Sequence, residues 1–503
     1  MATKTHVARL RDDLERAGYC EQAMRERLGP EGHAGLTRNC TVPGLSRLGA
    51  DDDPLALLIK LFPLQQTVPR QALDDVLDVT ALLEAGILGP ARPSPSATEQ
   101  LRALVDVRPI AFEDELGAWS GWVAADPVPG MDHTTTRTRP DYVLSVSPAS
   151  ISLAQLTIPD RLGSALDLGT GCGIQALHLA RHCARVVATD LNPRAVRMAQ
   201  LTAQLNRLDV DVRAGSLYEP VSDERFELIV SNPPYVMSPP VPEDSRLAYR
   251  EAGFEGDGLV RAVVRGAVAR LAPTGTLQVL ANWAESPQRS WQERLAAWVP
   301  DTGYQLWVVQ RERLDIYQYI ELWLTDAGLD GDPSWARRYQ EWLDYFESLD
   351  ITGVGMGWIM LRNSGVGPTE VTIEQWPYQI ASPVGPAVSR ELRARRFLHE
   401  DAEELWARRF RISPEVIQES VSQPGAADPS HIVLRQRAGL QRAMQVDTAL
   451  AGVLGACDGE LTLGTILDAV ARLLGEEASA LRARLLPELR RALAQGYLLD
   501  PAA

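Results

Sequence analysis

One stretch of the sequence constrains the fold more than any other: an apolar segment that runs straight into a turn rich in glycine. Residues 164–168 read as a buried strand, and a helix is expected over residues 175–181. Between them come Gly169, Gly171 and Gly173. Glycine adopts backbone conformations that other residues avoid, and it lets the main chain approach a ligand closely. The stretch therefore predicts the first strand, turn and helix of an α/β fold, with a ligand held at the turn.

A second strand that ends in an acid narrows the choice of ligand. Residues 185–189 form another apolar segment, and the next residue is Asp190. A carboxylate at that place holds the ribose of a bound nucleotide in many α/β folds. A nicotinamide cofactor is compatible with this pattern. The acid in the first strand, Asp167, and the spacing Gly-x-Gly-x-Gly favour S-adenosylmethionine, because its amino-acid end has no pyrophosphate to bind.

A four-residue motif, Asn232-Pro233-Pro234-Tyr235, follows the apolar segment 226–230, which reads as a buried parallel strand. Open α/β sheets bind ligands at the C-terminal ends of such strands. Proline lacks an N–H, so this backbone offers carbonyl oxygens without competing donors. The Asn232 side-chain oxygen and the Pro233 carbonyl would both accept from one –NH2 group, and the Tyr235 ring would stack on a planar group. The motif predicts a grip on an amide or on the amine of a base; a tight turn without a chemical role is the alternative.

Together these motifs give about residues 134–282 a family resemblance. The segment resembles class I S-adenosylmethionine-dependent methyltransferases, in the group of the release-factor glutamine-N5 and the adenine-N6 rRNA and tRNA methyltransferases. The resemblance implies a Rossmann-like α/β sheet, S-adenosylmethionine as cofactor, and Asn232, Pro233 and Tyr235 as catalytic residues. It also implies cofactor contacts at Asp167, Gly169, Gly171, Gly173, Asp190, Leu191, Ser216, Leu217 and Asn232. Ser216 departs from the family pattern, because an aspartate commonly binds the adenine amine at that place.

The segment before the first strand has two readings. In the family, the region of residues 132–142 and 147–150 helps to close the cofactor pocket. A polar linker followed by a helix cap is the alternative, and the residues do not decide between the two.

The motif also suggests how the reaction proceeds. Methyl transfer from a sulfonium is an in-line displacement, so alignment of nitrogen, methyl and sulfur supplies much of the catalysis. Hydrogen bonds accepted from the –NH2 group return electron density to its nitrogen, and no strong base is required. Asp244, Glu251 and Asp257 are candidates to relay the released proton, and a solvated loop is the more ordinary reading of each.

Charge, cysteines and histidines bear on partners and metals. The chain has 503 residues and a formal charge of −16, and only Lys4 and Lys60 among its 50 basic residues are not arginine. Proteins that bind long nucleic acid usually carry a basic surface, so this balance weakens the case for an RNA substrate without excluding it.

Five scattered cysteines without Cys-x-x-Cys argue against disulfides and structural zinc. His178 and His182 are spaced i, i+4, and we expect them on a helix surface rather than in a metal site.

Localisation follows from the hydropathy pattern. No apolar run reaches the length of a membrane span, and the N-terminus lacks a signal-peptide core. We therefore expect a cytoplasmic protein with no membrane segment; the sequence leaves its oligomeric state open.

Four segments are expected. They are an N-terminal winged-helix-like module (1–125), the class I methyltransferase catalytic domain (126–325), an aromatic-rich insertion or sheet extension (326–400) and a C-terminal winged-helix-like module (401–503). We predict the last two strands of the catalytic sheet over residues 307–310 and 319–324. An insertion over about residues 326–365 would shape a substrate lid, and its regularly spaced aromatic residues are expected to form a core.

The function we predict is N-methylation of a planar –NH2 group with S-adenosylmethionine. A glutamine in a protein or peptide and an adenine in RNA are the leading substrates. The charge and the segment Gly256-Asp257-Gly258-Leu259, which resembles the glutamine branch of the family, favour the polypeptide. The alternatives are an N-methyltransferase of a small molecule or peptide natural product, and a non-catalytic module that keeps the cofactor fold to bind a partner.

Overall fold

A computed structural model describes residues 3–91, 99–114, 116–134, 138–240, 253–424 and 429–501. The chain divides into two compact units. Unit 1 contains residues 1–154 and 161–376, and unit 2 contains residues 155–160 and 377–503. Among the described residues, no helix is both long enough and apolar enough to cross a bilayer.

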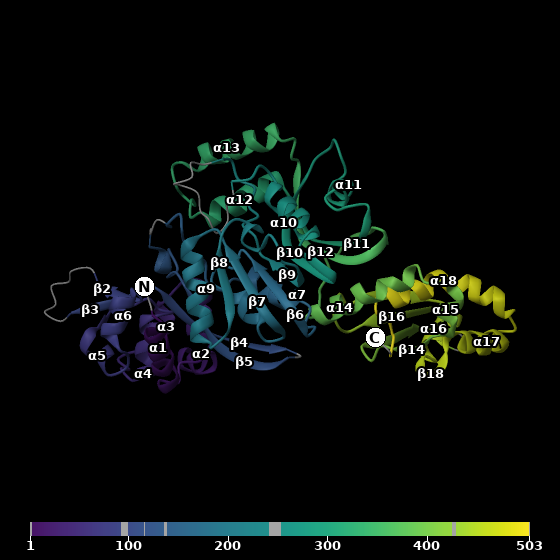
Figure 1. Ribbon diagram of the computed structural model, residues 1–503, viewed down its shortest axis with the longest axis horizontal. Helices are drawn as coiled ribbons and strands as arrows, with labels where there is room; N and C mark the ends of the chain where they lie inside the picture. Colours follow the sequence, from purple (N-terminus) through teal and green to yellow (C-terminus); the bar gives the residue numbers. More distant parts are fainter. Residues whose placement is uncertain are drawn as a thin grey trace. The chain divides into compact units, whose positions relative to one another are not determined.

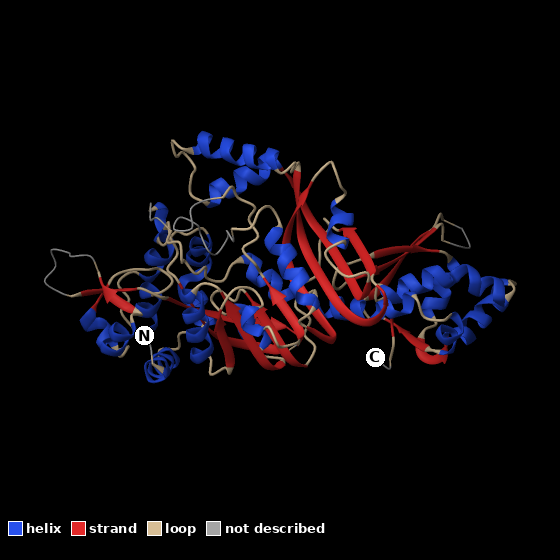
Figure 2. Cartoon of the chain, turned by 45° about the horizontal axis from the view of Figure 1, so that its top comes forward, coloured by secondary structure: helices blue, strands red, loops and turns tan. Residues whose placement is uncertain are grey.

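An eight-stranded sheet is the centre of unit 1, with the strand order β13-β11-β12-β10-β9-β6-β7-β8 (Figures 1 and 2). All neighbours are parallel except β12, which is antiparallel to both β10 and β11. This α/β sheet confirms the predicted Rossmann-like fold class. The strands are β6 (Leu162–Leu168), β7 (Cys183–Asp190), β8 (Val210–Ala214), β9 (Phe226–Ser231), β10 (Leu271–Glu285), β11 (Thr302–Asp315), β12 (Gly353–Pro368) and β13 (Glu370–Gln375).

Helices connect the parallel strands. The chain steps from β6 through α8 (Ile174–Leu179) and α9 (Pro193–Leu205) towards β8, and from β9 through α10 (Gly258–Val268) towards β10. The two series move in opposite directions along the sheet, so right-handed crossovers place their helices on opposite faces. Accordingly, α8 and α9 contribute to one buried apolar cluster, and α10 and α11 (Trp291–Ala296) contribute to another.

The strand order reverses between β6 and β9, which are neighbours in the sheet. Leu168, the last residue of β6, lies opposite Ser231, the last residue of β9, and the Ser231 hydroxyl donates to the Leu168 carbonyl at 2.7 Å. Ligands of open α/β sheets bind at such a reversal, outside the C-terminal ends of the strands. The glycine turn after Leu168 and the motif that begins at Asn232 therefore start side by side.

The described residues before position 126 share a buried apolar core with α8 and α9, which flank the sheet. Their elements are α1 (Lys4–Arg16), α2 (Glu21–Thr37), α3 (Val42–Leu48), α4 (Pro54–Leu61), β1 (Val68–Pro69), α5 (Arg70–Asp74), α6 (Val79–Ala85), β2 (Leu88–Pro90), β3 (Gln100–Ala103), β4 (Asp106–Asp114) and β5 (Gly117–Ala125). One cluster of buried residues extends from Val7 in α1 to Leu205 in α9. The predicted division at residue 125 stays a prediction about folding units, and in the structure apolar packing is continuous across it.

Two helices are inserted in the chain between the neighbouring strands β11 and β12. The helical pair consists of α12 (Ile316–Asp326) and α13 (Trp335–Ser348), which lie side by side in Figure 1. The predicted strand over residues 319–324 is wrong, because Asp315 and Gln318 form a capping box that starts a helix at Ile316. The missing strand is β12, whose first part lies inside the segment we expected to be an insertion.

The described residues of unit 2 form five α-helices and short sheets. Its elements are α14 (Gly385–Ala394), α15 (Ala402–Ala407), β14 (Arg409–Ile412), β15 (Val416–Val421), β16 (His431–Gln436), β17 (Ala443–Val446), α16 (Thr448–Gly455), β18 (Asp458–Thr462), α17 (Leu463–Leu474), α18 (Ala478–Ala494) and β19 (Leu498–Leu499). The order helix, strand, helix, helix, strand occurs both in α4-β1-α5-α6-β2 and in α16-β18-α17-α18-β19. Each set builds a three-stranded sheet whose middle strand is a further segment, β3 or β14. The winged-helix likeness of both remains a prediction.

Candidate functional site

The glycine turn after β6 has the backbone that its sequence predicts. Gly169, Gly171 and Gly173 have φ values of +78°, +57° and +85°, a region that residues with a side chain rarely adopt. A Cβ atom at Gly169 or Gly171 would extend into open space, whereas one at Gly173 would lie 3.1 Å from Ala199 in α9. The first two glycines thus leave room above the turn, and the third allows α8 and α9 to pack closely.

Asp190, at the end of β7, is fixed beside this turn. One of its carboxylate oxygens accepts from the Gly171 N–H at 2.9 Å and the other accepts from the Asn192 N–H at 2.8 Å. Burial raises the pKa of this carboxyl group above its usual value. A carboxylate oxygen accepts more than one hydrogen bond, so both oxygens retain capacity for the hydroxyl groups of a ribose.

Asp167 is inside the first strand and its side chain supports the turn. The residue is 1% exposed, and one carboxylate oxygen accepts from the Thr170 hydroxyl at 2.6 Å and from the Ala176 N–H at 2.9 Å. Burial is the main reason why the pKa of this carboxyl rises to about 7. The position therefore ties β6, the glycine turn and the first turn of α8 together.

Two apolar residues predicted to contact the cofactor have unusual environments. Leu191 follows Asp190 and is 70% exposed. Leu217 has a φ of +47°, a left-handed conformation that is strained for leucine and that often marks a functional position. Its neighbour Ser216 is partly buried, and the Ser216 N–H lies 3.3 Å from a Glu219 carboxylate oxygen. An exposed leucine and a strained one are compatible with an apolar wall that a planar base would cover.

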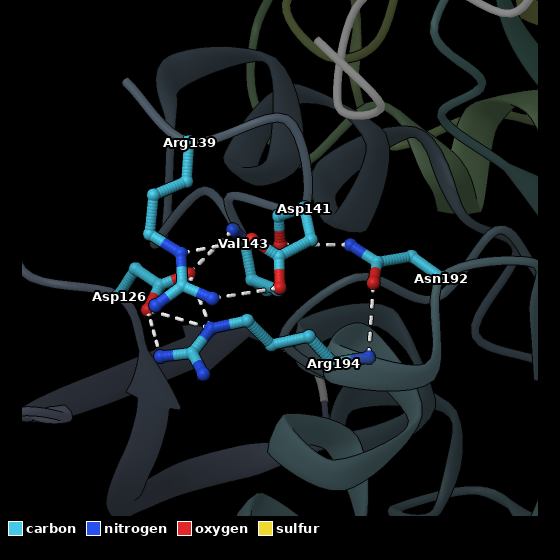
Figure 3. Close-up of polar contacts among 6 residues, drawn as sticks. All are labelled: Asp126, Arg139, Asp141, Val143, Asn192 and Arg194. Carbon is cyan, nitrogen blue, oxygen red and sulfur yellow. Dashed lines mark hydrogen bonds and ion pairs between the residues drawn. The ribbon is translucent and has the colours of Figure 1, made fainter. Parts of the chain in front are cut away.

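A polar network joins Asp126 and residues 139–143, which precede β6, to Asn192 and Arg194, which follow β7 (Figure 3). The Arg194 guanidinium, in the first turn of α9, binds both carboxylate oxygens of Asp126, and the Val143 N–H donates to Asp126 at 2.8 Å. The Asn192 side-chain amide donates to the Asp141 carbonyl at 3.0 Å. Residues 138–143 are thereby held next to the residues that follow β7, as expected of a wall of the cofactor pocket.

Other parts of that segment have local roles. Asp132 accepts from the N–H of Thr41 at 2.6 Å, which ties it to α3. The Ser147 hydroxyl accepts from the Ser150 N–H at 3.2 Å, as a helix cap does, at the start of α7 (Pro148–Leu156). Thr135 and Thr136, within the predicted region, lie outside the described residues. The helix-cap reading thus holds at Ser147 and Ser150, and the closing of a cofactor pocket by this segment stays a prediction.

The motif after β9 lies at the rim of the sheet. Asn232 is partly buried, Pro233 is buried, and Tyr235 is partly buried against the cluster that contains α10. Burial raises the pKa of the Tyr235 phenol. The position of Asn232, directly after the hydrogen-bonded pair Ser231–Leu168, sets its backbone beside the glycine turn.

Of the three candidate proton relays, the structure describes Asp257. Asp257 is the N-terminal cap residue of α10, and its carboxylate binds Arg294 at 2.6 Å and accepts from the Ala284 N–H at 2.9 Å. These contacts fit a structural anchor better than a solvated loop or a proton relay. Asp244 and Glu251 lie outside the described residues.

The helix-surface prediction for His178 and His182 is wrong, because both are buried, at 4% and 7% exposure. The ring of Phe112, from the β4–β5 hairpin, lies 5.5 Å from that of His178 and covers it. Burial lowers the pKa of His178 to about 3, so the ring is neutral at physiological pH. Within the described ranges, no three histidine, cysteine, aspartate or glutamate side chains are grouped as metal ligands.

Sequence reasoning missed two kinds of site residue. Arg194 and Asp126 are far apart in the sequence, and a charged pair gives no motif. Tyr319 and Tyr345, in the helical pair, belong to no recognisable sequence motif either. Their hydroxyl groups accept from the backbone N–H groups of Met237 and Gly256, respectively. Only the long-range contacts of the structure identify them.

Family models match three parts of the chain. Residues 146–297 match the Methyltransferase small domain. Residues 16–98 and 391–500 match two models that are each described as a Domain of unknown function, DUF7059 and DUF7782. The methyltransferase match includes the glycine turn, Asp190 and the Asn-Pro-Pro-Tyr motif.

Curated relatives align with the same region. The chain is 40% identical over 142 residues to a release factor glutamine methyltransferase of Deinococcus radiodurans, covering 26% of this chain and 50% of the relative. It is 32% identical over 126 residues to the ribosomal RNA small subunit methyltransferase C of Erwinia tasmaniensis, covering 25% and 32%. A solved structure, the T. thermophilus 16S rRNA N2 G1207 methyltransferase (RsmC) in complex with AdoMet and guanosine, is 20% identical with a TM-score of 0.26, covering 46% of this chain and 58% of that chain.

The chain spans about half the length, or less, of the curated relatives it matches. These matches confirm the predicted resemblance to class I methyltransferases of the release-factor and rRNA group. The family match also shows that residues 146–297 are similar to the Methyltransferase small domain.

Proposed function

We propose that this protein is an N-methyltransferase that transfers a methyl group from S-adenosylmethionine to a planar –NH2 group of a protein, a peptide or an RNA. One observation supports this above all. The glycine turn and Asn232 follow neighbouring parallel strands, and the paired residues Leu168 and Ser231 bring their starting points together at the reversal of strand order. A donor on the turn and an acceptor on the motif would therefore meet at one edge of the sheet.

The residues around the turn fit the proposed cofactor. Gly169 and Gly171 leave open space, Asp190 would bind the ribose hydroxyls, and the exposed Leu191 would pack on the adenine. Gln175 is 3% exposed, and its side-chain oxygen has no hydrogen-bond partner among the described residues. Its side-chain N–H donates to the Ser150 carbonyl at 2.6 Å, which ties the first turn of α8 to α7 beside the glycine turn. When bound, S-adenosylmethionine supplies an electrophilic methyl group on its sulfonium.

The acceptor grip explains why an amide or aromatic amine could react. The lone pair of such a nitrogen is delocalised and attacks poorly. Asn232 and the Pro233 carbonyl would accept hydrogen bonds from its two protons, which returns electron density to the nitrogen and offsets the charge that develops there. They would also hold the nitrogen in line with the methyl group, and Tyr235 would stack on its plane.

The relatives leave the substrate open between two classes, because one is named for a release factor glutamine and another for ribosomal RNA. A small molecule or peptide natural product remains an alternative, and so does a non-catalytic binding module. The intact glycine turn, Asp190 and Asn-Pro-Pro-Tyr motif favour catalysis, since a module that only binds a partner has no need of an acceptor grip.

Substitution at the motif tests the proposal. Methyl-labelled S-adenosylmethionine and fractionated cell lysate serve as substrates, and cofactor affinity is measured by calorimetry. Asn232→Ala should lower label transfer about a hundredfold or more while the cofactor affinity stays within about twofold, because only the acceptor grip is lost. Asn232→Asp is the matched control, since its carboxylate oxygens still accept hydrogen bonds and should retain measurable transfer. Full activity of Asn232→Ala would refute the assigned grip.

A further inference from the structure

The helical pair α12–α13 is attached to both sides of the segment that follows the Asn-Pro-Pro-Tyr motif. On the near side, the Tyr319 hydroxyl in α12 accepts from the Met237 N–H at 3.1 Å and from the Asn282 side-chain amide at 3.2 Å. On the far side, the Tyr345 hydroxyl in α13 accepts from the Gly256 N–H at 2.9 Å. The pair therefore fixes where the chain leaves the motif and where it returns to α10.

Apolar packing reinforces these hydrogen bonds. Val236 and Met237, directly after Tyr235, belong to one buried cluster with residues of α12, α13 and the start of β12, among them Tyr319, Ile320, Leu324, Trp342 and Phe346. Tyr319 is fully buried. The carboxylate of Asp326, in the last turn of α12, is near enough to Tyr235 to contribute to its raised pKa, after burial. The residues that directly follow the Asn-Pro-Pro-Tyr motif are thus packed against this helical pair.

The helical pair is rich in acidic residues. Residues 316–348 contain seven acidic residues and only two basic ones, Arg337 and Arg338. Both arginines pair with Glu341, at 2.5 Å and 3.2 Å, so their charges are partly offset within α13. Between these charges α12 exposes apolar surface, because Tyr317 is 55% exposed and Leu322 is 45% exposed.

This surface suits one class of macromolecule better than the other. Nucleic acids bind through phosphates that lysine and arginine neutralise, and an acidic wall repels them. A polypeptide with basic residues gains from complementary charge, and exposed aromatic and aliphatic side chains offer it apolar contacts. On the basis of the proposed function, we propose that α12–α13 is the acceptor-selecting element of this enzyme, and that it selects an amide in a basic polypeptide segment rather than a base in RNA.

The nature of the labelled product tests the choice of substrate. The full chain is incubated with methyl-labelled S-adenosylmethionine and fractionated cell lysate, and the product is treated with protease, with RNase or by dialysis. The label should be sensitive to protease and resistant to RNase. Label in RNA would overturn this inference alone, whereas label in a dialysable small molecule would overturn the proposed function as well. Cofactor binding without label in any fraction would overturn the proposed function, and this inference with it.

Charge variants test the role of the acidic surface. Asp344→Asn with Glu347→Gln removes two exposed acids of α13 and should raise the KM for the labelled protein fraction about three- to tenfold, with unchanged kcat and cofactor affinity. Asp209→Asn with Asp223→Asn is the matched control. These exposed acids precede the N-terminal ends of β8 and β9, whereas the candidate site follows the C-terminal ends of the strands. Equal KM values for the two double variants would overturn the proposed selection.

Removal of the two hydroxyl groups tests the attachment. Tyr319→Phe keeps the buried ring but loses the hydrogen bonds to Met237 and Asn282, and it should lower kcat about tenfold or more through misplacement of the motif. Cofactor affinity should change little, whereas the melting temperature should fall by a few degrees, because the buried Met237 N–H and Asn282 amide lose their acceptor. Tyr345→Phe should act in the same direction from the other side. Wild-type kcat in both variants would show that the helical pair does not position the Asn-Pro-Pro-Tyr motif.

Discussion

Replacement of Asp167 by asparagine should stabilise the protein, and by more at high pH than at low pH. The carboxyl is 1% exposed and its pKa rises from 3.8 to about 7, chiefly through burial. An asparagine oxygen in the same place would still accept from the Thr170 hydroxyl and the Ala176 N–H. The substitution therefore removes the buried charge and keeps the contacts that hold the turn.

The pKa shift sets the sign and the size of the effect. Between about pH 4 and pH 7 the folded state holds a proton on Asp167 that the unfolded state has released, so the free energy of unfolding falls as pH rises. Each pKa unit corresponds to about 1.4 kcal/mol, so the loss is complete above pH 7 and reaches about 4 kcal/mol at most. Asp167→Asn should remove it, leaving a small difference from the wild type at pH 4 and a stabilisation of a few kcal/mol at pH 8.

Urea unfolding without cofactor, followed by tryptophan fluorescence, measures this difference. Trp406 is the only one of the twelve tryptophans outside unit 1, so the signal reports mainly on the unit that contains Asp167. The exposed Asp209→Asn is the control and should show no such pH-dependent gain. Equal stabilities of Asp167→Asn and wild type at pH 8 would refute the argument that this buried charge destabilises the fold.

Two further substitutions probe the cofactor side of the site. Leu191→Ser should weaken cofactor binding about fivefold without a change in melting temperature, because the side chain is 70% exposed and becomes covered only by the ligand; Leu473→Ser, at 85% exposure in unit 2, is the calorimetric control and should leave the affinity unchanged. Arg194→Ala leaves Asp126, whose side chain is 6% exposed, without its ion pair and should cost about 3 kcal/mol of unfolding free energy. Arg139, which pairs with Asp141, has a side chain that is 62% exposed, so Arg139→Ala should cost less than about 1 kcal/mol of unfolding free energy in the same urea titration. Equal losses of unfolding free energy in Arg194→Ala and Arg139→Ala would contradict the argument from burial.

Local sequence patterns were sufficient for β6, β7 and β9, the parallel strands that carry the candidate site. The alternation of apolar segments, glycines and acids predicts parallel strands, and parallel strands place their C-terminal residues at one edge. The adjacency of Gly169 and Asn232 follows from that rule, although 63 residues separate them. Helix caps are equally local, since the Asp53 side chain accepts from the Ala56 N–H three residues later at the start of α4.

The errors arose where long-range contacts decide the structure. Residues 319–324 carry aromatic and aliphatic side chains that suit a strand or a helix, and the cap at Asp315 together with packing against α13 makes them helical. The strand that replaces them, β12, is fixed by pairing with β10 and β11. His178 looked exposed because the hairpin residue Phe112 that covers it lies 66 positions earlier in the chain.

The chemical position of the transferred methyl group tests the central claim most directly. The claim is that Asn232 and Pro233 hold a planar –NH2 group in line with the methyl donor. If labelled product from the protein fraction is hydrolysed in strong acid and the hydrolysate is then made alkaline, an N-methyl amide releases its label as volatile methylamine, and this is the result we expect. Label that leaves as methanol in mild base, or that stays on a carbon or sulfur atom of an amino acid, would contradict it.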